Sequence, residues 1–205
     1  MKLMKWALVK GLKIFIKYRD RFLRKKYALQ LKIQELSQGG HVTFGSNLQM
    51  NQPTIFQGKG DLYLNNGVIL GYSIGGAPSL PILLQPREIY AQIIIGKESI
   101  IANGTEIIAR EKVVLGEKCR IGARCIILDS DFHGLRPQER NTSGKVAKVI
   151  IGDNVWLGMG VMVLKGVVIG DDAVIGAGCV VTKSVPAGAI AVGNPMKIVG
   201  SVYDD

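Results

Sequence analysis

Apolar residues recur every six positions in the second half of the chain. Seven aliphatic residues at this spacing form one row, namely Ile151, Leu157, Val163, Ile169, Ile175, Val181 and Ala187. A period of six differs from the helical period of about 3.6 and from the strand period of about two. It is typical of a β-helix, in which short strands alternate with corners and successive coils stack on one another. The pattern therefore predicts a mainly β protein built from stacked coils.

A second row lies two positions before the first and contains small or aliphatic residues, namely Val149, Val155, Val161, Val167, Ala173, Cys179 and Val185. The other two cysteines, Cys119 and Cys125, take the same kind of position in an earlier stretch. We therefore expect all three cysteines to be buried thiols in a reducing compartment, without disulfides. A C-x2-C spacing, which many zinc sites use, does not occur in the sequence.

Two shorter rows precede the main one. The first contains Ile95, Ile101 and Ile107, and the next contains Leu115, Ile121 and Ile127. A slip of two residues separates them and indicates a small insertion at a corner. Residues 72–92 fit the row poorly, and residues 129–148 interrupt it with polar residues, so we expect both segments to leave the coil. The 24 residues from Ile127 to Ile151 equal four hexads, which predicts that the register survives the second excursion.

The N-terminal part of the chain has a different pattern. Residues 1–35 contain eleven Lys and Arg and two acidic residues, a net charge of +9, whereas the remaining fifteen basic and fourteen acidic residues give +1. Apolar residues at spacings near three and four predict one or two basic amphipathic helices. We expect this helical arm over residues 1–38 and a β-helix domain over 39–200. Lysines interrupt every apolar run of the arm, so neither a cleaved signal peptide nor a membrane-spanning helix is expected.

The arm has two candidate roles. A cationic amphipathic helix can lie on anionic lipid, because apolar burial and charge attraction act together. It can equally cap the first coil, whose strands would otherwise expose unpaired backbone groups. Because the rest of the chain is near neutral, its charge does not predict a nucleic-acid partner. We expect a cytoplasmic protein, and on the first role a peripheral one at the inner face of the cell membrane.

The second excursion begins with the polar cluster Asp129-Ser-Asp131-Phe-His133, directly after a predicted strand. Histidine is the natural general base near neutral pH, and a nearby carboxylate can hold its tautomer. Asp129 and Asp131 are both available, and the sequence does not choose between them. The alternative is a surface histidine in an acidic loop. The chain has one other histidine, His41, so a catalytic zinc held by three histidines is excluded, and we expect no metal.

Two further residues have alternative interpretations. Lys183 follows a run of small residues at a corner, where it could bind a phosphate as a point charge or remain a solvated lysine. Trp156 lies near a corner after the second excursion, where it could line a ligand groove or pack against a neighbouring subunit.

Four motifs occur in an order that resembles the hexapeptide-repeat acyltransferases, namely D-x-D-F-H at 129–133, V-W-L-G at 155–158, I-G-A-G at 175–178 and V-V-T-K at 180–183. The resemblance extends over about residues 60–200 and is greatest to sugar O-acetyltransferases of galactoside, maltose and bacterial polysaccharide type. It implies a left-handed parallel β-helix with about 18 residues per triangular coil. It also implies a homotrimer with acetyl-CoA in the groove between neighbouring subunits, and no metal or redox cofactor.

The resemblance further implies roles for individual residues. His133 is the base that deprotonates an acceptor hydroxyl, which then attacks the thioester. The positions that match acceptor contacts are Asn103 and Glu111. The positions that match CoA contacts are Met159, Ala177, Thr182, Lys183 and Lys197. The family often has Ser or Ala where Met159 stands and Arg where Lys197 stands, and the second change keeps the charge but loses the planar fork.

The function implied by the resemblance is CoA-dependent O-acetylation of a saccharide in surface polysaccharide or lipid-linked sugar biosynthesis. N-acetylation of an amino sugar, free or nucleotide-linked, stays open because its chemistry is similar. A non-catalytic trimeric scaffold is a third alternative from a different class, because β-helices can serve as rigid spacers.

Overall fold

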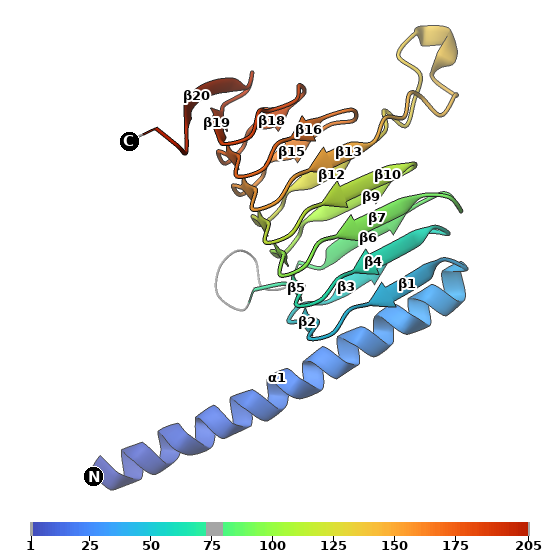
Figure 1. The fold of residues 1–205 in the computed structure, drawn as a ribbon. Coiled ribbons are helices and arrows are strands. Elements are labelled where there is room, and N and C mark those ends of the chain that lie inside the picture. Colours follow the sequence, from blue (N-terminus) through green and yellow to red (C-terminus); the bar gives the residue numbers. More distant parts are fainter. Residues whose placement is uncertain (1, 73–79, 205) are drawn as a thin grey trace.

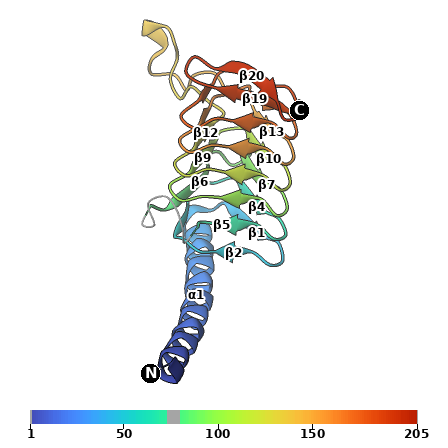
Figure 2. The same cartoon turned by 90° about the vertical axis from the view of Figure 1, so that its left-hand side faces the viewer.

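The structure is a computed structural model, and it describes residues 2–72 and 80–204. One long helix, α1 (Lys2–Gln38), is followed by a three-sided stack of short strands (Figure 1). A short 3-10 helix, η1 (Pro137–Glu139), lies in a loop that projects from the stack. In Figure 1 α1 runs across the end of the stack that the first coil forms, and in both views its N-terminal part extends beyond the stack (Figures 1 and 2).

Each side of the stack is one sheet. The first sheet contains, in spatial order, β1 (His41–Phe44), β4 (Asp61–Leu64), β7 (Gln92–Ile95), β10 (Lys112–Leu115), β13 (Val149–Ile151) and β16 (Val168–Ile169). The second contains β2 (Gln49–Met50), β5 (Ile69–Leu70), β8 (Ile100–Ile101), β11 (Arg120–Ile121), β14 (Trp156–Leu157), β17 (Val174–Ile175), β19 (Ala189–Val192) and β20 (Lys197–Ser201). The third contains β3 (Thr54–Phe56), β6 (Ile82–Pro86), β9 (Glu106–Ala109), β12 (Ile126–Leu128), β15 (Met162–Val163) and β18 (Val180–Val181). Neighbouring strands are parallel, except that β20 pairs antiparallel with β19.

The hexad row distributes one apolar residue to each side of a coil. Ile151 lies in the first sheet, Leu157 in the second and Val163 in the third, and all three are buried. Ile151 pairs with Ile169, 18 residues further on, so one turn of the coil takes three hexads. The fold is a left-handed parallel β-helix with an N-terminal helix, and the predicted fold class is confirmed.

The register survives the second excursion as predicted. Leu115 pairs with Ile151 although 36 residues separate them, which equals two turns of 18. The two-residue slip before Leu115 is the corner at Arg110 and Glu111, between β9 and β10. The excursion therefore leaves and re-enters the stack without disturbing the ladder above it.

The expected pattern differs from the structure at two places. Val185, and not Ala187, bridges to Ile169, so the hexad row ends at Val181 and Ala187 is exposed. This last coil is two residues shorter, and Pro186, which has no N–H to donate, follows the bridge. The excursion expected over 72–92 is narrower, because β6 lies inside it and pairs with β3 and β9; residues 73–79 lie outside the described part.

The three cysteines are buried and unpaired, as the second row predicts. The Cys125 thiol lies 3.2 Å from the carbonyl oxygen of Gly158, and burial raises the pKa of Cys125 to about 11. Burial also raises the pKa values of Cys119 and Cys179. These thiols therefore remain protonated near neutral pH and act as small apolar core residues.

The C-terminal half of α1 covers the first coil. Leu31 is fully buried in the core, and the side chains next to it bond backbone groups that a strand below would otherwise satisfy. A carboxylate oxygen of Glu35 accepts the N–H of Val42 at 2.9 Å, and Lys32 donates to the Val42 carbonyl at 2.8 Å. The amide oxygen of Gln34 accepts the N–H of Phe56 at 2.8 Å. This half of the helix thus caps an edge that would otherwise be open to another strand.

Two leucines of α1 give a matched test of the cap. Leu31→Ala removes a fully buried side chain and should lower the free energy of unfolding by about 2–5 kcal/mol. Leu36→Ala makes the same chemical change at a side chain that is 85% exposed, so its effect should stay within about 0.5 kcal/mol. Denaturant unfolding of both variants measures the difference. Equal losses of stability would show that α1 does not pack on the first coil.

Candidate functional site

The candidate site lies at the corner where the third sheet passes into the first. There β12 ends at Leu128, and the chain leaves the stack and returns to it at Val149. The corners at 87–91 and at 110–111 lie below this loop along the same edge of the stack. Residues far apart in the sequence therefore meet there, and each is placed by the strand that precedes it.

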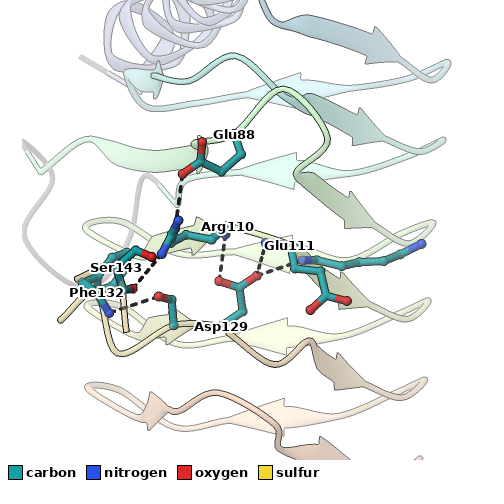
Figure 3. A network of polar contacts seen from close by, with 8 residues as sticks. Glu88, Arg110, Glu111, Asp129, Phe132 and Ser143 are labelled. Atoms are coloured by element: carbon teal, nitrogen blue, oxygen red, sulfur yellow. Dashed lines mark hydrogen bonds and ion pairs between the residues drawn. The ribbon is translucent and has the colours of Figure 1, made fainter. Parts of the chain in front are cut away.

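Asp129 anchors the start of the loop. Its side chain is fully buried, and its two carboxylate oxygens accept three backbone N–H groups from the corner below, those of Arg110, Glu111 and Lys112, at 2.7–2.8 Å (Figure 3). Three hydrogen bonds to one carboxylate hold both its oxygens in fixed positions. The corner that it binds is the one that the two-residue slip creates. Asp129 thus has a structural role at the base of the loop.

Asp131 and the far end of the loop tie it to the next coil. A carboxylate oxygen of Asp131 forms an ion pair with Lys165 at 2.7 Å, and the N–H of Asp131 donates to the carbonyl oxygen of Lys145 at 3.0 Å. Ser130 bridges to Val146 on the returning segment. The two ends of the loop therefore hold each other, and Lys165 joins them to the corner after β15.

The ring of His133 is held by a backbone carbonyl. Its Nδ1 lies 2.8 Å from the carbonyl oxygen of Arg140, so Nδ1 carries the proton and donates it, because a carbonyl can only accept. Nε2 is then the basic nitrogen. The Asp129 carboxylate instead accepts backbone N–H groups, and Asp131 pairs with Lys165. The expectation that one of these carboxylates holds the tautomer is therefore corrected, since the Arg140 carbonyl holds the ring.

Gly144 packs directly against the backbone of His133. It has a φ of +68°, and a Cβ at this position would lie 2.5 Å from the carbonyl oxygen of His133. Such a contact is too short for any real side chain. The returning half of the loop can therefore approach His133 only because residue 144 has no side chain.

His133 lines a cavity of about 310 Å³ together with Arg87, Glu88, Arg110, Phe132 and Ser143. Within it, Arg110 donates from Nε to Glu88 at 3.2 Å and from Nη1 to the carbonyl oxygen of Ser143 at 2.7 Å (Figure 3). The Arg87 guanidinium lies over the Phe132 ring, 5.2 Å from its centre. The cavity thus combines one histidine with two arginines and an aromatic wall.

Sequence reasoning missed Arg87, Glu88, Arg110 and Phe132 as residues of this site. The slip at 110–111 marked a corner insertion, and this was the available signal for Arg110. Arg87 and Glu88 fall within the segment 72–92, which the sequence pattern predicts to leave the coil. Their position beside His133 follows from the pairing of β6 with β9, which the sequence pattern did not predict.

The other predicted residues lie along two different edges of the stack. Glu111, Thr182 and Lys183 lie on the edge of His133, at the corners after β9 and β18, and all three are exposed. Asn103, Met159 and Ala177 lie on the edge between the second and third sheets.

Trp156 and Lys197 are outside both groups. Trp156 is 56% exposed on the outer face of β14, and Lys197 is exposed at the start of β20. One chain therefore does not bring all the predicted residues together.

Asn103 is fully buried, and its amide bonds both backbone groups of Tyr72, accepting from the N–H at 2.9 Å and donating to the carbonyl oxygen at 3.0 Å. This arrangement holds two adjacent coils together.

Among the described residues, no group of three His, Cys, Asp or Glu side chains is placed to hold a metal ion.

The chain is similar to the hexapeptide-repeat transferases in sequence and in fold. Residues 148–183 match the family described as bacterial transferase hexapeptide (six repeats). A polysialic acid O-acetyltransferase of Escherichia coli O1:K1 / APEC is 39% identical over 111 residues, which cover 53% of this chain and 36% of that protein. The match thus spans about a third of the length of this relative. The resemblance to hexapeptide-repeat acyltransferases that the motifs indicate is confirmed.

Solved structures share the fold at lower identity. A hexapeptide-repeat acetyltransferase of Vibrio cholerae O1 biovar eltor, complexed with acetyl coenzyme A, is 20% identical with a TM-score of 0.57, covering 86% of this chain and 78% of that chain. A mutant N-acyltransferase of Bacillus cereus, in complex with dTDP and coenzyme A, is 21% identical with a TM-score of 0.63, covering 83% and 87%.

The tautomer of His133 is directly testable. We expect the neutral ring of His133 to carry its proton on Nδ1, because the Arg140 carbonyl accepts it at 2.8 Å. Nitrogen-15 NMR of the imidazoles distinguishes the two tautomers, and the chain has only two histidines to assign. A signal from Nε2–H in neutral His133 would contradict the hydrogen bond.

Gly144→Ala should disturb this arrangement, because the new Cβ collides with the His133 backbone. Gly39→Ala is the matched control, since Gly39 has a φ of +77° but no atom within 4 Å of its would-be Cβ. Both variants incur a similar backbone strain of roughly 1 kcal/mol. The His133 imidazole shifts should change only in Gly144→Ala.

Proposed function

We propose that this chain is an acetyltransferase that moves an acetyl group from acetyl-CoA to a saccharide hydroxyl. The observation that carries the proposal is His133, whose ring lines a cavity while its Nδ1–H is engaged by the Arg140 carbonyl. The similarity to a polysialic acid O-acetyltransferase supports a saccharide as the acceptor. We further propose a place in surface polysaccharide or lipid-linked sugar biosynthesis, with a peripheral contact to anionic membrane through residues 1–35.

In the proposed reaction, Nε2 of His133 accepts the proton of the acceptor hydroxyl as its oxygen attacks the thioester carbonyl. The hydrogen bond from Nδ1–H to the Arg140 carbonyl orients the ring and stabilises the imidazolium that forms. The imidazolium then returns the proton to the departing thiolate. Asp129 and Asp131 contribute by holding the loop in place, through the N–H groups of the 110–112 corner and through Lys165.

We propose that the complete site forms between two subunits of a homotrimer. His133, Thr182 and Lys183 lie on one edge of the stack, whereas Met159 and Ala177 lie on another edge of the same chain. Threefold symmetry places one edge of each subunit beside a different edge of its neighbour. Met159 and Ala177 of one subunit would then bind CoA beside the His133 loop of the next, while Lys197 would lie near the nucleotide.

His133→Ala tests the catalytic role. General-base catalysis typically contributes about a hundredfold to ten-thousandfold, so kcat in a thiol-release assay with acetyl-CoA should fall by that range. The assay is run against sugars, amino sugars and amino acids, which also separates O-acetylation from the alternative N-acetylation. His41→Ala is the control, because His41 lies at the start of β1 and contacts Glu35 under the helix. Unchanged transfer in His133→Ala would remove His133 from this role, and no transfer to any acceptor by the wild type would favour a scaffold.

Mixed trimers test the site between subunits. His133→Ala and Ala177→Glu should each be nearly inactive alone, since Ala177 is exposed and a glutamate there would obstruct the groove. In a random equal mixture, a site needs an intact loop from one subunit and an intact edge from the next, so about a quarter of the wild-type activity should return. If the whole site lay within one chain, the mixture would stay inactive.

A further inference from the structure

The helix α1 carries a row of large apolar side chains that no part of the stack covers. The members of this outward stripe are Ile14, Tyr18, Phe22, Leu29, Ile33 and Leu36. Their spacings of four, four, seven, four and three place them on one side of a helix that turns by about 100° per residue. Tyr18 and Phe22 are each 68% exposed, and Leu36 is 85% exposed.

The outward stripe lies opposite the face that caps the first coil. Leu31, which is fully buried against that coil, is two residues from both Leu29 and Ile33. Two residues correspond to a rotation of about 200°, so Leu31 points away from both neighbours. A helix that served only as a cap would present a polar face to water. The capping contacts therefore explain one face of α1 and leave the other unexplained.

The charged side chains around the stripe indicate what kind of surface it contacts. Lys25 lies within the stripe, and Arg21 and Lys26 lie just outside its two margins; all three are exposed. Residues 1–35 carry a net charge of +9, so two such helices would repel each other. An anionic bilayer surface offers both an apolar layer for the stripe and negative headgroups for the flanking cations. Within the described residues, no helix has the length and hydrophobicity needed to cross a bilayer.

We propose that the outward stripe of α1 docks the protein on an anionic lipid surface, with the helix lying in the plane of the headgroups. The stack then stands on the opposite side of the helix, and the His133 loop projects at the far end (Figure 1). The biological purpose of this contact rests on the proposed function, since saccharides assembled on lipid carriers lie at such a surface. The contact itself depends only on residues of α1.

Flotation of the full-length protein with vesicles tests the docking surface. Wild type should bind vesicles of roughly two parts phosphatidylcholine to one part phosphatidylglycerol and bind pure phosphatidylcholine much more weakly. The triple variant Phe22→Gln, Leu29→Gln, Ile33→Gln should lose at least about tenfold in partition coefficient on the anionic vesicles, because it removes three inserted side chains. Glutamine keeps the helical preference, and all three positions are exposed, so the fold is preserved.

A matched control removes exposed apolar side chains at the other end of the stack. Ile198→Gln with Val199→Gln, in β20, should bind vesicles as the wild type does. Lys25→Gln with Lys26→Gln should weaken binding to the anionic vesicles and reduce its salt dependence. Wild-type vesicle binding by the triple stripe variant would overturn the proposal. The proposal would also be overturned if the triple stripe variant bound vesicles as the wild type does but had a smaller molar mass than the wild type by light scattering. That result would make the stripe a contact between copies of the chain.

The readouts separate this proposal from the proposed function. The triple stripe variant should keep the wild-type rate of thiol release with a soluble saccharide acceptor, since its three positions are exposed and none of them lines the His133 cavity. Loss of vesicle binding with normal acetyl transfer supports docking. Vesicle binding by a wild type that transfers acetyl to no acceptor would refute the enzyme proposal and leave the docking surface standing.

Discussion

The structure depends on a hydrogen-bonded ladder between each strand and the strand one coil further along. Trp156 donates its N–H to the carbonyl oxygen of Ala173 at 2.9 Å, and Met162 donates to that of Cys179 at the same distance. Strands of two or three residues have no stability by themselves, so each coil must return at a fixed height to meet the next. The chain turns sharply at the corners between strands, and there Asn154 adopts a left-handed conformation with a φ of 54°. The need to return at a fixed height also confines any insertion to a corner, and the candidate site occupies one.

A ladder of this kind is incomplete at both ends of the stack. At the first coil the side chains of α1 supply the missing partners, with Glu35 and Lys32 bonding Val42. At the last coil β20 turns back antiparallel on β19, which ends the parallel repeat. A cap must be apolar on the face that it buries, but nothing in capping requires an apolar outer face. Packing on the stack therefore explains the apolar inner face of α1, whereas its apolar outer face requires a contact outside the stack.

The fold could be predicted from the sequence because the six-residue spacing of the aliphatic row equals the number of residues in one side of a coil. Each aliphatic residue of the row fills one side of the coil, so six-residue spacing predicts the sheet assignment of Ile151 and Leu157. The prediction failed at Ala187, because Val185 takes the inward position two residues early. It also missed β6, whose buried Ile82 and Leu84 lie between prolines that indicate a loop. The pattern thus fails where a coil is shortened or where prolines border a strand.

The site could be predicted only in part, because its decisive partners are backbone groups. The sequence indicates His133 as the base, and two carboxylates nearby suggest the group that orients it. Yet the orienting acceptor is the Arg140 carbonyl, and every residue has a carbonyl, so no sequence pattern can identify it. Asp129, in turn, bonds three backbone N–H groups of a neighbouring corner. A buried carboxylate that satisfies several backbone donors fixes a loop more firmly than one that shares a single proton with an imidazole. In this loop the aspartates therefore determine where the histidine stands, and a carbonyl determines which of its nitrogens is basic.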